Sequence, residues 1–335
     1  MKNLIIIDGY KSKLNIVETE KAIKFVKDNF ERDLAEELSL VRVSAPLFVL
    51  PSTGLNDELD GKVKRIDFSI KGIEENAEIV QSLAKWKRSA LAKYNFSIDE
   101  GLYTDMNAIR KEEDLDNIHS AYVDQWDWEK IILKENRNID FLKTIVRKIY
   151  NVLLVTERRV IEEFPSIEPV LPNDIYFISS FELEKLYPNL SPVQREYEIC
   201  KEKKAVFITQ IGAALSNGKP HSDRAADYDD WDLNGDLLLY YKELDIALEI
   251  SSMGIRVDEN SVIRQLLTKN EGHKVDNSYI KGIINKKLPY TIGGGIGQSR
   301  ICMFFLKKAH IGEVQVSVWD DNDIKLLNEK NIFLL

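Results

Sequence analysis

The stretch TIGGGIGQSR, residues 291–300, limits the fold and the ligand of this chain more than any other segment. Four of the chain's 16 glycines fall within five of its positions, and Arg300 follows three residues after the last of them. Because glycine lacks a Cβ, such a run lets backbone approach a ligand closely. Ile301, Phe304 and Phe305 recur at helical spacing, so we expect a glycine-rich turn that opens a helix. The free N–H groups of that turn and the charge of Arg300 suit a phosphate or carboxylate, which indicates a nucleotide site.

Composition restricts the class of protein. The chain has 335 residues, of which 44% are hydrophobic, and can bury a substantial core. Its net charge of −9 disfavours a general nucleic-acid-binding protein. Only two cysteines occur, Cys200 and Cys302, as expected in a reducing compartment. The apolar run at 4–7 is far too short for a signal peptide or a membrane span. We therefore expect a soluble cytoplasmic protein that binds neither nucleic acid nor membranes.

Long helices dominate the first half of the chain. A helix is predicted at 20–38, where apolar side chains recur on one face, and a short strand follows at 40–43. Further helices are predicted at 83–94, at 140–164 and after the capping residue Ser191.

Strands dominate the second half, and they are predicted at 205–211, 236–241, 247–252 and 313–318. In the last of these, valines alternate with polar residues. Because the strands follow one another without regular βαβ alternation, we expect an α+β fold on a largely antiparallel sheet, not a Rossmann fold.

The motif VDQWDWE is a second signal for a polar site. In a strand, successive side chains point to opposite faces. Gln125, Asp127 and Glu129 would then share one face, while Trp126 and Trp128 would anchor the core on the other. For this segment alone, a half-exposed strand whose polar face meets water is the simpler interpretation.

Glu249 is the strongest candidate for a buried acid, since Leu248 and Ile250 flank it in a strand of buried type. A buried carboxylate is costly unless it is paired or binds a cation. Asp236, after an Asn-Gly turn signal, supplies a second acid on a neighbouring strand. Two acids near a phosphate-binding arginine suit Mg²⁺ with a nucleotide. A structural ion pair between Glu249 and Arg256 is the alternative.

Two charged runs each allow a structural and a functional interpretation. ADYDDWD packs four acids into six positions and is either a solvated loop or an acidic pocket for a substrate ammonium group. In KWKR we expect Lys85 and Arg88 on the solvated face of a helix, and the spacing does not distinguish Lys87. His119 and His221 are candidate acid–base groups, but nothing supports a Ser/His/Asp triad.

Together these motifs resemble the ammonia-dependent asparagine synthetases, or aspartate–ammonia ligases. The resemblance runs from Ser82 to the C-terminal region, and several segments are long enough to be specific. The matching segments are SLAKWKR (82–88), EGLYTDMNAIR (100–110), HSAYVDQWDWE (119–129), DYDDW (227–231), LNGD (233–236), LEISSMGIRVD (248–258), TIGGGIGQSR (291–300) and HIGEVQVSVW (310–319). The connection between DYDDW and LNGD is shorter than the family pattern, which bears on how the pocket is covered.

That family in turn resembles the catalytic domain of class II aminoacyl-tRNA synthetases, especially the aspartyl and asparaginyl enzymes. The resemblance implies a single catalytic domain over 1–335, an antiparallel sheet flanked by helices, and a homodimer. The helix 20–38 resembles the first class-defining motif, and Arg110 with the strand 121–129 resembles the second. The glycine run with Arg300 resembles the third. No tRNA-binding module is visible in this acidic chain.

The resemblance implies a two-step reaction. The β-carboxylate of aspartate attacks the α-phosphate of ATP, which gives β-aspartyl-AMP and diphosphate; ammonia then attacks the acyl carbon, and AMP leaves. Arg110 would hold the α-phosphate and the attacking carboxylate. Arg300 would hold the γ-phosphate and lie near adenine, and Glu249 and Asp236 would carry Mg²⁺.

It also implies a substrate pocket. Lys87 would neutralise a substrate carboxylate, and Asp57 would bind the amino group together with Asp229. Asp57 is also the candidate acceptor for the proton that ammonium must lose. The remaining residues implied are Ser82, Gln125 and Asp127 on the aspartate side, Ser252 and Arg256 on the nucleotide side, and Gly294 and Gly295 where adenine approaches the sheet.

Two alternatives have less support. A synthetase-like adenylating enzyme would charge another acceptor, which predicts a tRNA- or protein-binding extension that the sequence does not contain. A catalytically dead relative would sense an amino acid, which predicts loss of Arg110, Arg300 or the metal acids, and all of these are present.

Overall fold

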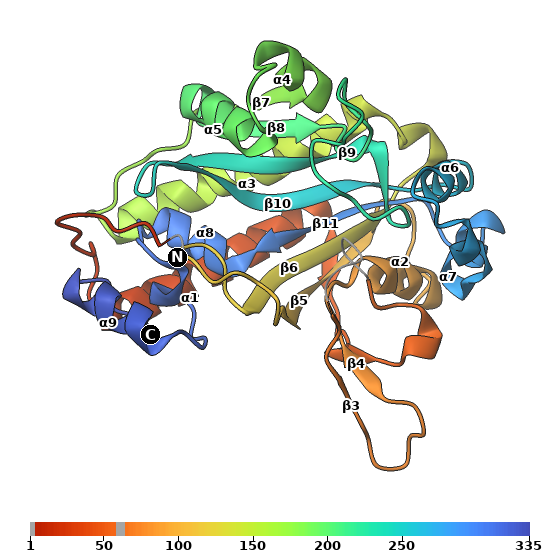
Figure 1. Cartoon of the computed structure of the whole chain (residues 1–335), viewed down its shortest axis with the longest axis horizontal. Coiled ribbons are helices and arrows are strands. Elements are labelled where there is room, and N and C mark those ends of the chain that lie inside the picture. The colour runs from red at the N-terminus through yellow and green to blue at the C-terminus, as the bar shows by residue number, and fades with distance from the viewer. Residues whose placement is uncertain (1–3, 58–63) are drawn as a thin grey trace.

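A large, mostly antiparallel sheet forms the centre of the computed structural model, which describes residues 4–57 and 64–335 (Figure 1). Neighbouring strands are antiparallel except in the pairs β1–β5 and β7–β8. In spatial order the strands are β1 (Leu40–Arg42), β5 (Gly101–Ile109), β6 (Tyr122–Ile131), β11 (Thr291–Gly297), β10 (Ile246–Arg256), β9 (Asp229–Tyr241), β8 (Ala205–Thr209) and β7 (Tyr176–Ser179). The predicted α+β class is confirmed.

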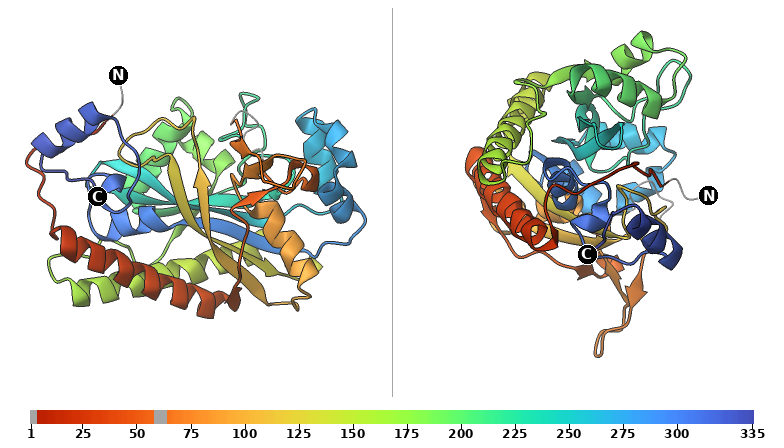
Figure 2. Two further views of the ribbon diagram at one scale, coloured as in Figure 1. Left: turned by 90° about the horizontal axis from the view of Figure 1, so that it is seen from below. Right: turned by 90° about the vertical axis from the view of Figure 1, so that its left-hand side faces the viewer.

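Helices cover both faces of the sheet. The two longest, α1 and α3, lie side by side against one face (Figure 2). The α-helices are α1 (Ile16–Leu38), α2 (Ala84–Lys93), α3 (Ile139–Glu163), α4 (Ser180–Leu186), α5 (Pro192–Lys203), α6 (Ser261–Thr268), α7 (Ser278–Ile284), α8 (Gln298–Phe305) and α9 (Asp321–Glu329). None of the helices among the described residues is long and apolar enough to cross a membrane.

The first long helix, α1, is anchored at its start and along its buried face. Asn15 accepts a hydrogen bond from the Glu18 N–H at 3.0 Å, and the Glu18 carboxylate accepts one from the Asn15 N–H in return. This capping box starts the helix four residues before the predicted boundary. On the buried face, Phe30 stacks on Trp126 of β6, with ring centroids 4.9 Å apart.

Successive side chains along the strands point to opposite faces of the sheet and so form two separate hydrophobic cores. Phe207 and Leu237 belong to the larger core beneath α1 and α3, which also contains Trp126 and Trp128. Val206 packs on the opposite face, in a smaller core with α5. The VDQWDWE motif therefore anchors the larger core with its tryptophans, as predicted, and presents its polar side chains on the opposite face.

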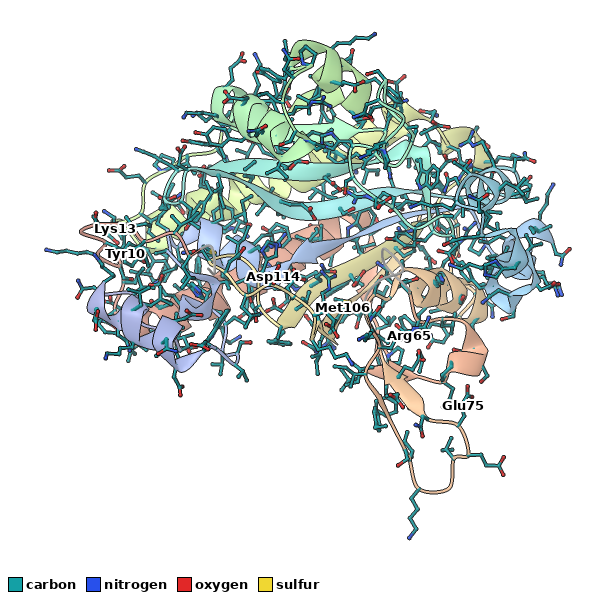
Figure 3. All side chains as sticks on the ribbon, in the orientation of Figure 1. Tyr10, Lys13, Arg65, Glu75, Met106 and Asp114 are labelled. Carbon is teal, nitrogen blue, oxygen red and sulfur yellow. The ribbon has the colours of Figure 1, made fainter. Side chains whose placement is uncertain are left out.

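A small three-stranded sheet projects from the body of the molecule, and Arg65 and Glu75 mark this arm (Figure 3). Its strands are β2 (Phe48–Val49), β4 (Ala77–Ile79) and β3 (Asp67–Phe68). A 3₁₀ turn, Pro51–Thr53, follows β2. Residues 58–63, which come later in the same connection, lie outside the described residues.

The prediction of a strand at 313–318 is wrong. The chain there makes a 3₁₀ turn over Ile311–Glu313 instead. Glu313 holds the turn, because its carboxylate accepts hydrogen bonds from Tyr10 and from the backbone of Ala309. Val316 and Val318 are 67% and 80% exposed, so the alternation of valines reflects no sheet face.

The glycine-rich turn predicted before α8 is also wrong. Residues Thr291–Gly297 form β11, a strand in the interior of the sheet that pairs with β10 on one side and β6 on the other. The helix α8 follows directly, as predicted. The short connection between DYDDW and LNGD is likewise part of a strand, since β9 runs without a break from Asp229 to Tyr241.

Candidate active site

A polar cavity of about 320 Å³ lies on the sheet face opposite the larger core. The connection between β5 and β6, on which Asp114 is labelled in Figure 3, contributes one wall. The cavity is lined by twelve of the predicted site residues: Ser82, Lys87, Arg110, Gln125, Asp127, Asp229, Glu249, Ser252, Arg256, Gly294, Gly295 and Arg300. Asp57 and Asp236 are buried but do not line it.

Arg256 forms the centre of a buried ion-pair network. Its Nη2 lies 2.7 Å from Glu129 Oε2, and its Nη1 lies 2.5 Å from Asp229 Oδ1. Burial would raise the pKa of Glu129, but Arg256 outweighs it and the pKa is lowered. The alternative pairing of Arg256 with Glu249 is therefore wrong, because the guanidinium is bonded to two other carboxylates.

The glycines of β11 make room for this network. A Cβ on Gly293 would collide with Glu129 Oε2 and would lie 2.7 Å from Arg256 Nη2. On Gly294 a Cβ would lie 2.5 Å from Met253 Cβ, and on Gly295 it would collide with the Gln125 amide. Side chains and backbone of the neighbouring strands thus occupy the space beside Gly293, Gly294 and Gly295, so these glycines serve packing within the sheet.

Lys87 projects from α2 into the cavity. The side chain is buried, forms an ion pair with Asp127 and donates a hydrogen bond to the Gly294 carbonyl at 3.0 Å. Its ammonium and the Asp127 carboxylate together offer one charge of each sign to a ligand.

The prediction that Lys85 and Arg88 lie on a solvated helix face is wrong. Lys85 Nζ lies 2.6 Å from Asp227 Oδ2, and Arg88 donates at 2.8 Å to the carbonyls of Pro289 and Val257. Both side chains are buried. These three partners lie more than a hundred residues away in the sequence, so helical spacing alone gives no indication of them.

The acidic run is largely a buried structure and not a solvated loop. Asp227, Asp229 and Asp230 are buried, and each pairs with a basic side chain. Only Asp232 of the four is exposed, with half of its side chain accessible. Burial raises the pKa of Asp229 and Asp230, and the paired guanidinium groups of Arg256 and Arg137 oppose that rise.

Asp57 lies behind the cavity, beside Lys85. The carboxylate is fully buried, and its Oδ1 lies 3.7 Å from Lys85 Nζ. Burial raises the pKa of Asp57 to about 6, against the opposing effect of Lys85. A carboxyl group with this pKa can exchange a proton near neutral pH.

Glu249 reaches the cavity because of an irregularity in β10. The register with β9 shifts between Glu249 and Ser251, so that Glu249, Ser252 and Arg256 all line the cavity although strict alternation would separate them. Arg300, in the first turn of α8, donates from Nη1 to the Glu249 carbonyl at 2.9 Å. Burial and the charge of Asp236 raise the pKa of the Glu249 carboxyl.

Asp236 and Glu249 fit a divalent cation. Asp236 pairs with Ser252 across the two strands, so it points to the cavity face. Its Oδ1 is buried and accepts no hydrogen bond from any part of the chain that the structure describes. No group of three or more His, Cys, Asp or Glu side chains among the described residues is arranged around a metal. Two carboxylates with nucleotide and water oxygens is the donor set that Mg²⁺ uses.

Sequence reasoning missed several residues of this face. Arg224 forms an ion pair with Asp236, and Tyr228 lines the cavity. Asp124 accepts hydrogen bonds from Ser299 and Gln315 and pairs with Lys27 at 3.0 Å. A buried carboxylate requires a cationic or hydrogen-bonding partner. This requirement is the only feature of the sequence from which these residues could have been predicted.

Comparison with known proteins matches the chain over nearly its whole length. The family model described as aspartate-ammonia ligase matches residues 17–331. An aspartate–ammonia ligase of Ruminiclostridium cellulolyticum is 56% identical over 336 residues, covering 100% of both chains. One of Clostridium perfringens is 57% identical, also with full coverage of both.

Solved structures with a similar fold are class II aminoacyl-tRNA synthetases. The asparaginyl-tRNA synthetase of Pyrococcus horikoshii, complexed with asparaginyl-adenylate, matches with a TM-score of 0.66 and 17% identity, over 89% of this chain and 68% of that one. The aspartyl-tRNA synthetase of Entamoeba histolytica matches with a TM-score of 0.63 and 15% identity, over 91% of this chain and 59% of that one. The expected class II fold is confirmed.

The close packing around Gly293 predicts a strong effect of a single methyl group at this position. Gly293→Ala should lower the free energy of unfolding by about 1–3 kcal/mol, because its Cβ displaces Glu129 from Arg256. Urea denaturation measures this. Gly272→Ala is the matched control, since its nearest neighbour would be Leu267 Cδ2 at 3.6 Å. Equal stability of the two variants would contradict this role for the glycines.

Proposed function

Because the chain belongs to the aspartate–ammonia ligase family, we propose that it uses ATP to convert L-aspartate and ammonia into L-asparagine, AMP and diphosphate. The observation that carries the proposal is a single cavity in which a Lys87–Asp127 pair faces one part and Arg110, Glu249 and Arg300 face another. The first part matches an amino acid, which carries both charges. The second matches a nucleotide, which carries phosphates.

Arg110 supports the adenylation step. It follows β5 directly, and its backbone N–H donates to the Ala121 carbonyl at 2.8 Å, which fixes the start of the connection to β6. The Arg110 Nε is buried and donates to no acceptor among the described residues, so it is available to an anion. We assign Arg110 to the α-phosphate and the attacking β-carboxylate, where it balances charge that accumulates during transfer.

The same arrangement supports activation of the carboxylate as a mixed anhydride. An oxygen of the β-carboxylate bonds to the α-phosphorus as diphosphate leaves. Ammonia then attacks the acyl carbon, the bond between this carbon and the transferred oxygen breaks, and AMP leaves with that oxygen. We assign the γ-phosphate to Arg300, while Gly294 and Gly295 leave the sheet open to adenine.

Mg²⁺ would be held by Glu249 and Asp236. When bound, the ion would neutralise phosphate charge and hold the polyphosphate chain in one conformation. The irregularity in β10 contributes by turning Glu249 toward the cavity. Ser252, directly opposite Asp236, borders the same region.

The aspartate end would be built from paired charges. Lys87 and Asp127 offer a positive and a negative group, which suits the α-carboxylate and α-ammonium of one substrate, and Asp229 adds a second carboxylate for the ammonium. Ser82 and Gln125 also line the cavity, and they supply uncharged hydrogen-bond donors and acceptors. Such fixed, paired groups orient the substrate without reorganisation in the transition state.

We further propose that all 335 residues form one catalytic domain, which acts as a homodimer in the cytoplasm. Both cysteines are buried and unpaired, which suits a reducing compartment. The structural resemblance to synthetases spans 89–91% of the chain in the two matches given above.

Replacing Arg300 tests the nucleotide assignment. Arg300→Ala should fold normally and lower kcat/KM for ATP by about 10²-fold or more, because a phosphate ligand is lost. Asparagine and AMP formed from aspartate, ATP, Mg²⁺ and ammonium are the products to measure. Arg264→Ala is the control, since Arg264 is a half-exposed arginine that does not line the cavity and makes its shortest ion pair with the half-exposed Asp232. Wild-type protein that forms neither product under these conditions would refute the ligase function.

Asp57 predicts the pH dependence of the reaction. Its carboxyl group is protonated below its pKa of about 6 and can accept a proton only above it, so kcat should rise as the pH passes through about 6. Asp57→Asn should remove this inflection and lower kcat, whereas Asp67→Asn on the projecting arm should leave the profile unchanged. An inflection near pH 6 that persists in Asp57→Asn would assign the proton transfer to another group.

A further inference from the structure

Arg224 makes the closest charge contact of Asp236. Its Nη2 forms an ion pair with Asp236 Oδ2, and only 15% of the arginine side chain and 7% of the aspartate side chain are exposed. Arg224 comes from the connection between β8 and β9, and not from the sheet that carries Asp236. The two charges therefore meet across an interface between a loop and the sheet.

This pair lies at the border of the cavity. Glu249 lines the cavity, whereas Asp236 and Arg224 do not, although Asp236 lies on the strand face that points to it. With the pair closed, one Asp236 oxygen bonds the guanidinium and the other is buried without a hydrogen-bond donor among the described residues. Asp236 is therefore positioned as a cation ligand but is occupied by a cation that the chain itself supplies.

Charge balance explains why a cation is needed there. Asp236 is buried, Glu249 is partly buried, and burial together with the charge of Asp236 raises the pKa of the Glu249 carboxyl. Burial would lower the pKa of the Arg224 guanidinium, but Asp236 and Glu249 raise it above its usual value. Two neighbouring buried carboxylates without a counter-charge would be strongly unfavourable.

The attachment of Arg224 allows it to leave. Apart from Asp236, its guanidinium donates only at Nη1, to the Ser222 hydroxyl at 3.0 Å and the Asp223 carbonyl at 3.2 Å, as far as the described residues extend. Both acceptors belong to the same loop. Rotation of the side chain would therefore break one ion pair and leave the sheet intact.

We propose that Arg224 is a positioning residue that neutralises Asp236 before the metal–nucleotide complex binds and releases Asp236 to the incoming Mg²⁺. The inference rests on the proposed function, since it takes Asp236 and Glu249 as the Mg²⁺ ligands. Released from Asp236, the guanidinium faces the region where the phosphates bind, so one exchange of partners accommodates both the cation and the anion. Binding of Mg²⁺ without nucleotide is weak as a consequence, because the ion has to displace Arg224.

Metal affinity measured without catalysis tests this exchange. Mn²⁺ binding is followed by electron paramagnetic resonance on the full-length wild type and on Arg224→Gln, without nucleotide. The variant should bind Mn²⁺ about tenfold more tightly or better, because no internal cation competes. In EDTA the variant should melt at a lower temperature than the wild type, and Mn²⁺ should raise its melting temperature by a larger amount.

Two control variants separate exchange from simpler effects. Arg300→Gln removes another positive charge near Glu249, but Arg300 bonds the backbone carbonyl and not a carboxylate, so it should change Mn²⁺ affinity much less. Arg224→Lys keeps the charge and should gain less affinity than Arg224→Gln. The lysine variant also keeps the test valid if Arg224→Gln does not fold in EDTA.

The outcomes are distinct. Equal Mn²⁺ affinity in the wild type and Arg224→Gln, or an equal gain in Arg300→Gln, would overturn the exchange and leave the ligase proposal standing. Failure of every protein to bind Mn²⁺, even with a non-hydrolysable ATP analogue, would overturn the metal assignment together with the exchange. Asparagine formation, assayed separately, decides the ligase function in either case.

Discussion

The sheet face that lines the cavity depends on one constraint, the buried ion pairs of Arg256. A guanidinium removed from water is tolerated only when carboxylates compensate its charge, and here Glu129 and Asp229 do so from two other strands. Because Glu129 reaches Arg256 across β11, that strand must carry no side chain at Gly293, whereas Asp229 pairs with Arg256 from the adjacent strand β9. Gly293 follows from this electrostatic requirement, and the ion pairs couple the registers of β6, β9, β10 and β11.

The charged groups of this sheet face differ in whether another residue of the chain already pairs with them. Arg256, Lys85 and Lys87 are all paired with acids, which fixes their positions before any substrate arrives. Arg110, by contrast, keeps a buried donor free of partners among the described residues, and Asp236 keeps a free acceptor. Preorganised charges of this kind stabilise developing charge at low cost, because the protein need not rearrange during the reaction.

Local patterns predicted much of the fold. The periodicity of 20–38, the two tryptophans of VDQWDWE and the Ser191 capping box all correspond to the structure, because each depends on nearby residues. Predictions failed where distant contacts decide. The turn at 311–313 is held by Glu313 and Tyr10, and Lys85 and Arg88 of α2 are buried by partners more than a hundred residues away. Resemblance to a family supplied the residues of the site, but it gave no sign of the Arg224–Asp236 pair.

We propose that this cavity activates the aspartate side chain by attaching it to AMP. Aspartate labelled with ¹⁸O in both β-carboxylate oxygens, incubated with the protein, ATP, Mg²⁺ and ammonium, tests this directly by mass spectrometry of the products. The account predicts one ¹⁸O in AMP and one in the amide of asparagine. Unlabelled AMP, or ¹⁸O in inorganic phosphate with ADP as the co-product, would contradict it.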